Sequence, residues 1–225
     1  MESIATRTVC AIIFGLLLTA PATLSAQKNI DASMLHSPQV EAPEVLTLAA
    51  VTNSVGDYSA FLTALRHRES GGNYQVINTL NFVGAYQFGE AALIDLGYVR
   101  RDSDVYNNDF SGGFTGKHGI RSLQQFLNSP DVQDRAVQDW MGLMWHYIRS
   151  DGLDQYAWRE VGGVTLSPSG MLAATHLLGA GGLREFVDSN GSADIRDPYG
   201  MPLRNYIIDL GGYDIPFGPS LPDFL

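Results

Sequence analysis

Apolar residues in the first half of the chain predict a short helix with one hydrophobic face. Tyr58, Phe61, Leu62 and Leu65 recur with helical spacing, and Asp57 before them can cap the first turn. We expect this helix to end at the Ser-Gly-Gly triplet that follows, because glycine favours a helix C-terminus.

Four further helices are predicted from apolar periodicity and from start signals. Ser129-Pro130 and Ser167-Pro168 each place a capping residue before a proline at the first helical position. The expected ranges are Gly89 to Leu96, a long helix from Pro130 that includes Ile148, Pro168 to Leu178, and Leu203 to Leu210. Few strands are expected, although Tyr74 to Phe82 is compatible with a short β-hairpin. The predicted fold is therefore mostly α, with short helices joined by glycine-rich loops.

The helical region from residue 56 to 213 is predicted to form one domain. The two ends of the chain differ from it in composition. Residues 1–26 are typical of a secretory signal, with Arg7 before a 12-residue apolar run and small residues near Ala26. A bilayer-spanning helix needs about 20 residues, although an uncleaved anchor is the alternative. Residues 27–55 are predicted to be a flexible linker, and 214–225 a C-terminal tail. The protein is thus expected to be periplasmic or secreted.

Charge and cysteine content exclude several classes of function. The 225 residues contain 14 Lys and Arg against 24 Asp and Glu, so the net charge is −10. Nucleic acid is not an expected partner, because binding to phosphates needs clustered basic side chains. The single cysteine, Cys10, rules out an intrachain disulfide and any site built from several cysteines.

Glu69 is the first candidate for chemistry. It lies four residues after Leu65 and eight after Phe61, on the apolar face of the first predicted helix. It also lies in the last turn, where the helix dipole disfavours negative charge. Both effects raise the pKa of a carboxyl group, as a general acid for glycosidic cleavage requires. The alternative is a glutamate at a frayed helix end, paired with Arg66 or Arg68.

Two short motifs carry a resemblance to a known family. Glu69-Ser70-Gly71-Gly72 is followed about a dozen residues later by Gly84-Ala85-Tyr86-Gln87. In this order and spacing, after an amphipathic helix, they resemble the catalytic Glu-Ser and Gly-x-x-Gln motifs of peptidoglycan lytic transglycosylases in the lysozyme-like superfamily. The resemblance implies a lysozyme-like helical domain that acts on peptidoglycan glycan strands.

The resemblance also implies roles for individual residues. Glu69 would protonate the glycosidic oxygen between MurNAc and GlcNAc, and would then act as the base on the MurNAc 6-hydroxyl. Tyr86 and Gln87 would hold the sugar and its acetamido group, which assists the reaction. Ser70 would orient Glu69 or contact the glycan. No cofactor is implied.

The third motif of the family, of the type Ala-x-Tyr-Asn-x-Gly, is altered in this chain. Its nearest match begins at Ala173, with Thr175-His176 where relatives have Tyr-Asn, and with glycines after the helix. His176 could support Glu69 by hydrogen bonding or contribute to substrate binding, or it could be a core histidine. The departure indicates a divergent branch, nearer to phage-type muramidases.

Two other functions remain open. A hydrolytic muramidase on the same fold would need a second carboxylate to activate water or to stabilise the cation. Several acids lie within 45 residues of Glu69, namely Glu90, Asp95, Asp102, Asp104 and Asp109. The altered third motif and the negative net charge also allow a non-catalytic wall-binding or scaffold protein. A cell-envelope machine is a further candidate partner.

No metal site is predicted from the sequence. The five histidines have no pair at zinc-site spacing. Asp102-Ser103-Asp104 begins like a calcium loop, but Tyr106 and Asn107 stand where that loop needs a ligand and a glycine.

Overall fold

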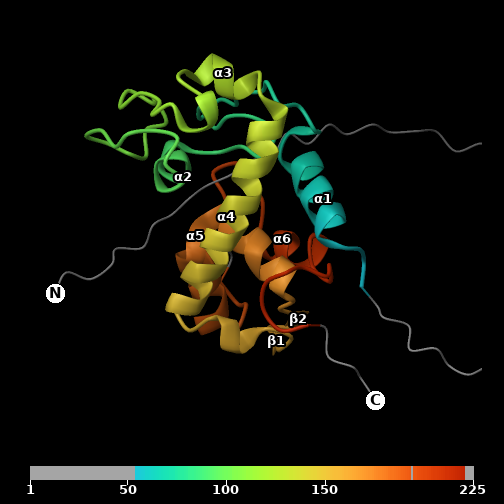
Figure 1. The fold of residues 1–225 in the computed structure, drawn as a ribbon. Coiled ribbons are helices and arrows are strands. Elements are labelled where there is room, and N and C mark those ends of the chain that lie inside the picture. Colours follow the sequence, from blue (N-terminus) through green and yellow to red (C-terminus); the bar gives the residue numbers. More distant parts are fainter. Residues whose placement is uncertain (1–53, 194, 221–225) are drawn as a thin grey trace, which may run out of the picture. The chain divides into compact units, whose positions relative to one another are not determined.

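The computed structural model describes residues 54–193 and 195–220. These residues form six α-helices, two 3₁₀ turns and one two-stranded antiparallel sheet. The predicted mostly α class with a small β-hairpin is therefore confirmed (Figure 1). The predicted signal segment, residues 1–26, lies outside the described residues, and so does the predicted linker up to residue 53.

Two long helices form the centre of the domain, and shorter elements pack around them. The helices are α1 (Tyr58–Ser70), α2 (Glu90–Asp95), α3 (Leu123–Leu127), α4 (Pro130–Ser150), α5 (Pro168–Asp188) and α6 (Leu203–Asp209). The strands are β1 (Glu160–Val161) and β2 (Val164–Thr165), and the 3₁₀ turns are η1 (Lys117–Gly119) and η2 (Asp154–Tyr156). Helix α5 packs against both α4 and α6. In Figure 1, α4 runs from the end of the domain that carries α2 and α3 towards the end that carries β1 and β2.

Capping groups set the predicted helix boundaries. The Asp57 side chain accepts a hydrogen bond from the backbone N–H of Ala60 at 2.9 Å, and Gly71 ends α1 in the left-handed conformation at φ 63°. Ser167 caps α5 in the same manner. Ser129 departs from the prediction, because its hydroxyl donates to the carbonyl of Gln125 and does not cap α4.

Helix α5 is the most buried element. Every residue from 168 to 179 is buried, so polar side chains in this stretch need partners within the protein. The helix breaks at the predicted end, where Gly179 has φ 69°, and then resumes to Asp188. The continuation was not predicted, because the glycines indicated a stop. Among the described helices, none is both long and apolar enough to span a bilayer.

The β-hairpin lies elsewhere than expected. The paired residues are Glu160 with Thr165 and Val161 with Val164, far from the predicted segment at Tyr74 to Phe82. That segment has turns and one isolated bridge between Ile77 and Val83. The Asn78 side chain accepts hydrogen bonds from the backbone N–H groups of Leu80 and Phe82, and this local pairing favours turns over a strand ladder.

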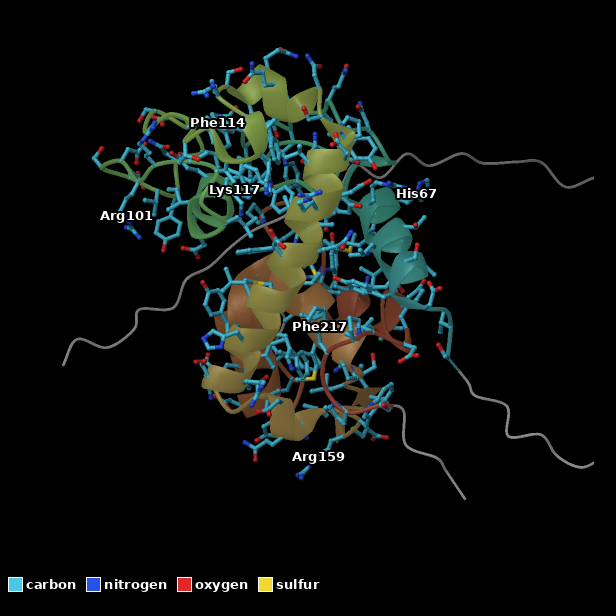
Figure 2. All side chains as sticks on the ribbon, viewed as in Figure 1. His67, Arg101, Phe114, Lys117, Arg159 and Phe217 are labelled. Carbon is cyan, nitrogen blue, oxygen red and sulfur yellow. The ribbon has the colours of Figure 1, made fainter. Side chains whose placement is uncertain are left out.

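The segment predicted as a C-terminal tail packs on the helices as far as residue 220. The Asp214 N–H donates to the carbonyl of Gly56 at 2.8 Å. The Phe217 ring meets Tyr58 edge-on at 5.8 Å and lies against α4 at Gly142 (Figure 2). These contacts make this stretch part of the helical unit.

Candidate active site around Glu69

Glu69 lies at the end of α1 with its side chain inside the protein. Its exposed fraction is 2%, and it shares its face of the helix with Phe61, Leu62 and Leu65, as the spacing predicts. Burial raises the pKa of this carboxyl group to about 8. At neutral pH the side chain is therefore mostly a neutral acid that can donate a proton.

Tyr206 on α6 is the direct hydrogen-bond partner of Glu69. Its hydroxyl donates to Glu69 Oε1 at 3.1 Å, and the tyrosine itself is fully buried. The guanidinium of Arg68 lies over the Tyr206 ring at 4.9 Å. Tyr206 was not among the predicted site residues, and it lies 137 positions from Glu69 in the sequence. A signal was present, because a tyrosine on the apolar face of a helix requires a buried partner for its hydroxyl.

His176 lies on α5 between Trp140, Tyr86 and Glu69. The indole N–H of Trp140 donates to His176 Nδ1 at 3.1 Å, so the ring proton is on Nε2. That Nε2–H donates to the Tyr86 carbonyl at 3.1 Å and lies 3.6 Å from Glu69 Oε1. Burial lowers the pKa of the imidazole to about 4, so the ring is neutral. The histidine is thus both a core residue and a neighbour of Glu69.

The second oxygen of Glu69, Oε2, is buried and has no hydrogen-bond partner. Burial has the largest effect on the pKa of Glu69; the Tyr206 hydrogen bond and the Arg68 charge lower it, and the Asp197 charge raises it. Asp197 is 5% exposed, and its own Oδ2 is also buried without a partner. The charge of a second buried carboxylate therefore raises the pKa of Glu69. Asp197 was not among the predicted site residues.

The structure brings the two sequence motifs into contact. The Ser70 hydroxyl donates to the carbonyl of Ala85 at 2.8 Å, which joins the end of α1 to the Gly84–Gln87 turn. Gly84 has φ 76°, and a Cβ there would lie 2.2 Å from Gln133 Oε1. That oxygen accepts the backbone N–H of Ala85 at 2.8 Å. Glycine is therefore required at this position, and the buried Gln133 of α4 holds the turn.

Tyr86 and Gln87, the predicted sugar contacts, are each only 2% exposed. The Tyr86 hydroxyl donates to Asp134 Oδ1 at 2.8 Å, and the Gln87 side chain donates to the carbonyl of Gly84 at 2.8 Å. Both side chains therefore have partners within the protein, and Tyr86 reaches the site through its carbonyl. Contact between either side chain and a glycan stays a prediction, and it requires the turn to open.

Two further contacts link segments around the Glu69 region. Arg68 beside it pairs with Asp209 at 2.9 Å and donates to Met201 Sδ at 3.3 Å. The hydroxyl groups of Thr79 and Tyr199 contact each other and join the turn before Gly84 to the loop before α6. Glu69 is itself nearly inaccessible, so any molecule that contacts Oε2 would have to displace some of its neighbours.

The five acids that were candidates for a second carboxylate do not all gather at one place. Glu90, Asp102 and Asp109 come together, with carboxylate oxygens within 4.8 Å of one another. Asp95 instead accepts a hydrogen bond from Tyr147, and Asp104 from the backbone N–H of Tyr106. The three clustered acids face one another, which their separation in the sequence did not predict.

No protein-family model, curated protein or solved structure matches the chain. A buried neutral acid that accepts a hydrogen bond from Tyr206 and has the neutral ring of His176 beside it can release a proton and then be stabilised as a carboxylate by the Tyr206 hydroxyl.

Proposed function

We propose that this chain cleaves the glycan strand of peptidoglycan as a lytic transglycosylase, with Glu69 as its acid and base. The observation that carries the proposal is the buried Glu69 carboxyl, whose pKa is raised to about 8 and whose Oε2 has no hydrogen-bond partner within the described residues. The contact between Ser70 and Ala85 supports it, because it joins the two motifs on which the family resemblance rests.

The reaction begins with proton transfer from Glu69 to the glycosidic oxygen between MurNAc and GlcNAc. The bond from MurNAc C1 to that oxygen breaks, and GlcNAc leaves with the proton as its 4-hydroxyl. The acetamido oxygen of MurNAc supports the positive charge at C1. The Glu69 carboxylate then removes the proton of the MurNAc 6-hydroxyl, whose oxygen attacks C1. The product is a 1,6-anhydro sugar, and Glu69 is protonated again.

Tyr206 stabilises the ionised form of Glu69 between the two steps, and the neutral ring of His176 lies beside it. The Tyr206 hydroxyl donates to Oε1, and the N–H of His176 lies 3.6 Å from the same oxygen. Neither residue carries a charge, since burial raises the pKa of Tyr206 and lowers that of His176. Neutral neighbours allow the acid to keep its proton before the reaction, and the Tyr206 hydrogen bond lowers the free-energy cost of losing it.

A hydrolytic muramidase is the second candidate, and Asp197 is the observation that favours it. This carboxyl group is buried, its charge acts on Glu69, and its Oδ2 lacks a partner. A second carboxylate in that position could activate water or stabilise the positive charge at C1. Water would then attack in place of the 6-hydroxyl.

Glu69→Gln tests the role of the acid. The amide keeps the size of the side chain but has no proton to give, so release of soluble fragments from purified peptidoglycan should fall by roughly a thousandfold or more. Glu185→Gln, an exposed change on α5, is the matched control and should retain full activity. Circular dichroism and thermal melting verify the fold of both variants. Fragment release by a folded Glu69→Gln variant at the native rate would refute the proposal.

The Asp197→Asn variant distinguishes a lytic transglycosylase from a hydrolytic muramidase. For a transglycosylase, the variant should still form 1,6-anhydro ends, because the proposed steps use only Glu69. For a hydrolase, the native protein should form reducing ends, and the variant should lose most of its activity. Mass spectrometry of the released fragments distinguishes these end groups.

A further inference from the structure

Three acids at the start of α2 converge without a positive partner. Glu90 opens this helix, and Asp102 and Asp109 come from the loop that follows it; their carboxylate oxygens lie within 4.8 Å of one another. In the part of the chain that the structure describes, no Lys, Arg or His forms an ion pair with any of the three. Their mutual repulsion therefore opposes this arrangement.

Glu90 has a buried oxygen without a partner. The residue is fully buried, and its Oε2 accepts the N–H of Phe110 at 3.1 Å, whereas Oε1 has no hydrogen bond. An unpaired buried oxygen on a carboxylate that lies close to two other carboxylates indicates a ligand that supplies positive charge.

The loop positions Asp109 through the two residues that flank it. Asn108 Oδ1 accepts the backbone N–H of Glu90 at 2.8 Å, and Asn108 Nδ2 donates to the carbonyl of Leu80 at 3.0 Å. The ring of Phe110 is buried and stacks on Phe114 at 6.3 Å. Both flanking residues have left-handed backbone conformations, at φ 57° and 56°. Asp109 is thus held close to the start of α2 by buried neighbours.

Hydrogen bonds orient the other carboxylate oxygens and leave each with capacity to bind. Asp102 accepts from the Asp104 N–H at 2.9 Å and from the Ser111 hydroxyl at 2.6 Å. Asp109 accepts from the Ser111 N–H at 2.7 Å and from the Asn107 amide at 3.0 Å. A carboxylate has about four lone-pair positions, so one donor on each oxygen fixes its direction without filling it.

We propose that Glu90, Asp102 and Asp109 form a calcium site that fastens the loop of residues 101–116 to α2. All donors are oxygens, which hard divalent cations prefer. Calcium accepts irregular sets of carboxylates, whereas magnesium demands octahedral geometry and usually keeps several waters and one or two carboxylates. Three carboxylates on an irregular loop therefore favour calcium, with water completing its shell.

Isothermal titration of the chelator-treated full chain with calcium chloride tests the site. We expect one calcium per chain, with a dissociation constant of roughly 10 μM to 1 mM. Asp109→Asn and Asp102→Asn should each weaken binding at least tenfold. Both side chains reach solvent, so neither change endangers folding. Asp188→Asn, an exposed change at the end of α5, is the control and should bind as the native chain does.

Three results would overturn the proposal. The first is no calcium binding at millimolar concentration, which would mean that Glu90 keeps its proton and bonds to a neighbouring carboxylate. The second is full calcium affinity in both folded Asn variants. The third is equal affinity for magnesium chloride, which would contradict the choice of calcium. Thermal melts with and without calcium supply an independent readout, in which only the native chain and the control should gain stability.

Discussion

Glu69 and Glu90 are both buried glutamates with one unpartnered oxygen, but their surroundings differ. Glu69 Oε1 faces the hydroxyl of Tyr206 and the neutral ring of His176. Glu90 instead faces the carboxylates of Asp102 and Asp109. Burial raises the pKa of both groups. We expect Glu69 to carry a proton and Glu90 to bind a cation, because their neighbours differ although both groups are buried.

The largest expected effect on stability is the pH dependence that Glu69 causes. Its pKa is raised from 4.5 unfolded to about 8 folded, so its contribution is complete below about 4.5 and is lost as the pH rises through about 8. The loss is on the order of 5 kcal/mol. Glu69→Gln should lack this loss and be the more stable protein at pH 9. Denaturant unfolding of both proteins between pH 5 and 9 measures it, and parallel profiles would contradict the assignment.

His176 determines how the free energy of unfolding falls at low pH. Its pKa is lowered from 6.5 to about 4, so it stabilises the fold above about 6.5, and this contribution is lost as the pH falls through about 4. Together the two groups predict highest stability between roughly pH 4.5 and 6.5. A maximum above pH 8 in the same unfolding experiment would show that Glu69 is ionised in the folded protein.

Tyr206→Phe removes the donor that lowers the pKa of Glu69 and stabilises its carboxylate. We expect kcat to fall about 10- to 100-fold, or about 1.5–3 kcal/mol, because a hydrogen bond to a charged group is lost. The basic limb of the pH–rate profile should move to higher pH, since the neutral acid is favoured. A lower rate with an unmoved limb would indicate a structural role only.

Calcium should act on Glu90 and leave Glu69 unaffected. Bound calcium should raise the free energy of unfolding by about 1–3 kcal/mol when its concentration is well above the dissociation constant. The gain should shrink at pH 5, where protons compete for carboxylates. Melts at pH 5 and 7.5 with calcium or chelator measure this. A calcium effect that also shifts the basic limb of the pH–rate profile would show that the two sites are coupled.

The smallest expected effect is that of Ser70→Ala. It removes the hydrogen bond to the Ala85 carbonyl, which costs about 1 kcal/mol of stability and a few-fold in activity. Thermal melts and fragment release measure the two effects. A loss of activity as large as that of Glu69→Gln would assign Ser70 a direct part in the reaction.

The sequence predicted the local parts of the fold well. Asp57, the apolar face of α1 and Gly71 determine where this helix begins and ends, and the same periodicity places Glu69 inside the protein. Such features depend on neighbours within a few residues, which a single sequence displays. The Ser-Pro starts of α4 and α5 were predicted for the same reason.

The missing parts of the site depend on long-range contacts. Tyr206 meets Glu69 only because α6 packs on α5, and Gln133 holds the Gly84 turn across 48 residues. Asp109 reaches Glu90 through left-handed conformations at its neighbours, which are unusual outside glycine. Neither helix packing nor such backbone conformations follow from hydrophobic periodicity.

The most direct test of the account is mass spectrometry of the soluble products after the purified chain is incubated with peptidoglycan. The account predicts fragments with 1,6-anhydroMurNAc ends from the native protein and none from Glu69→Gln. Fragments with ordinary reducing ends would identify water as the acceptor and direct attention to Asp197. The absence of fragments from the folded native protein, together with binding to the wall, would contradict catalysis and favour a wall-binding role.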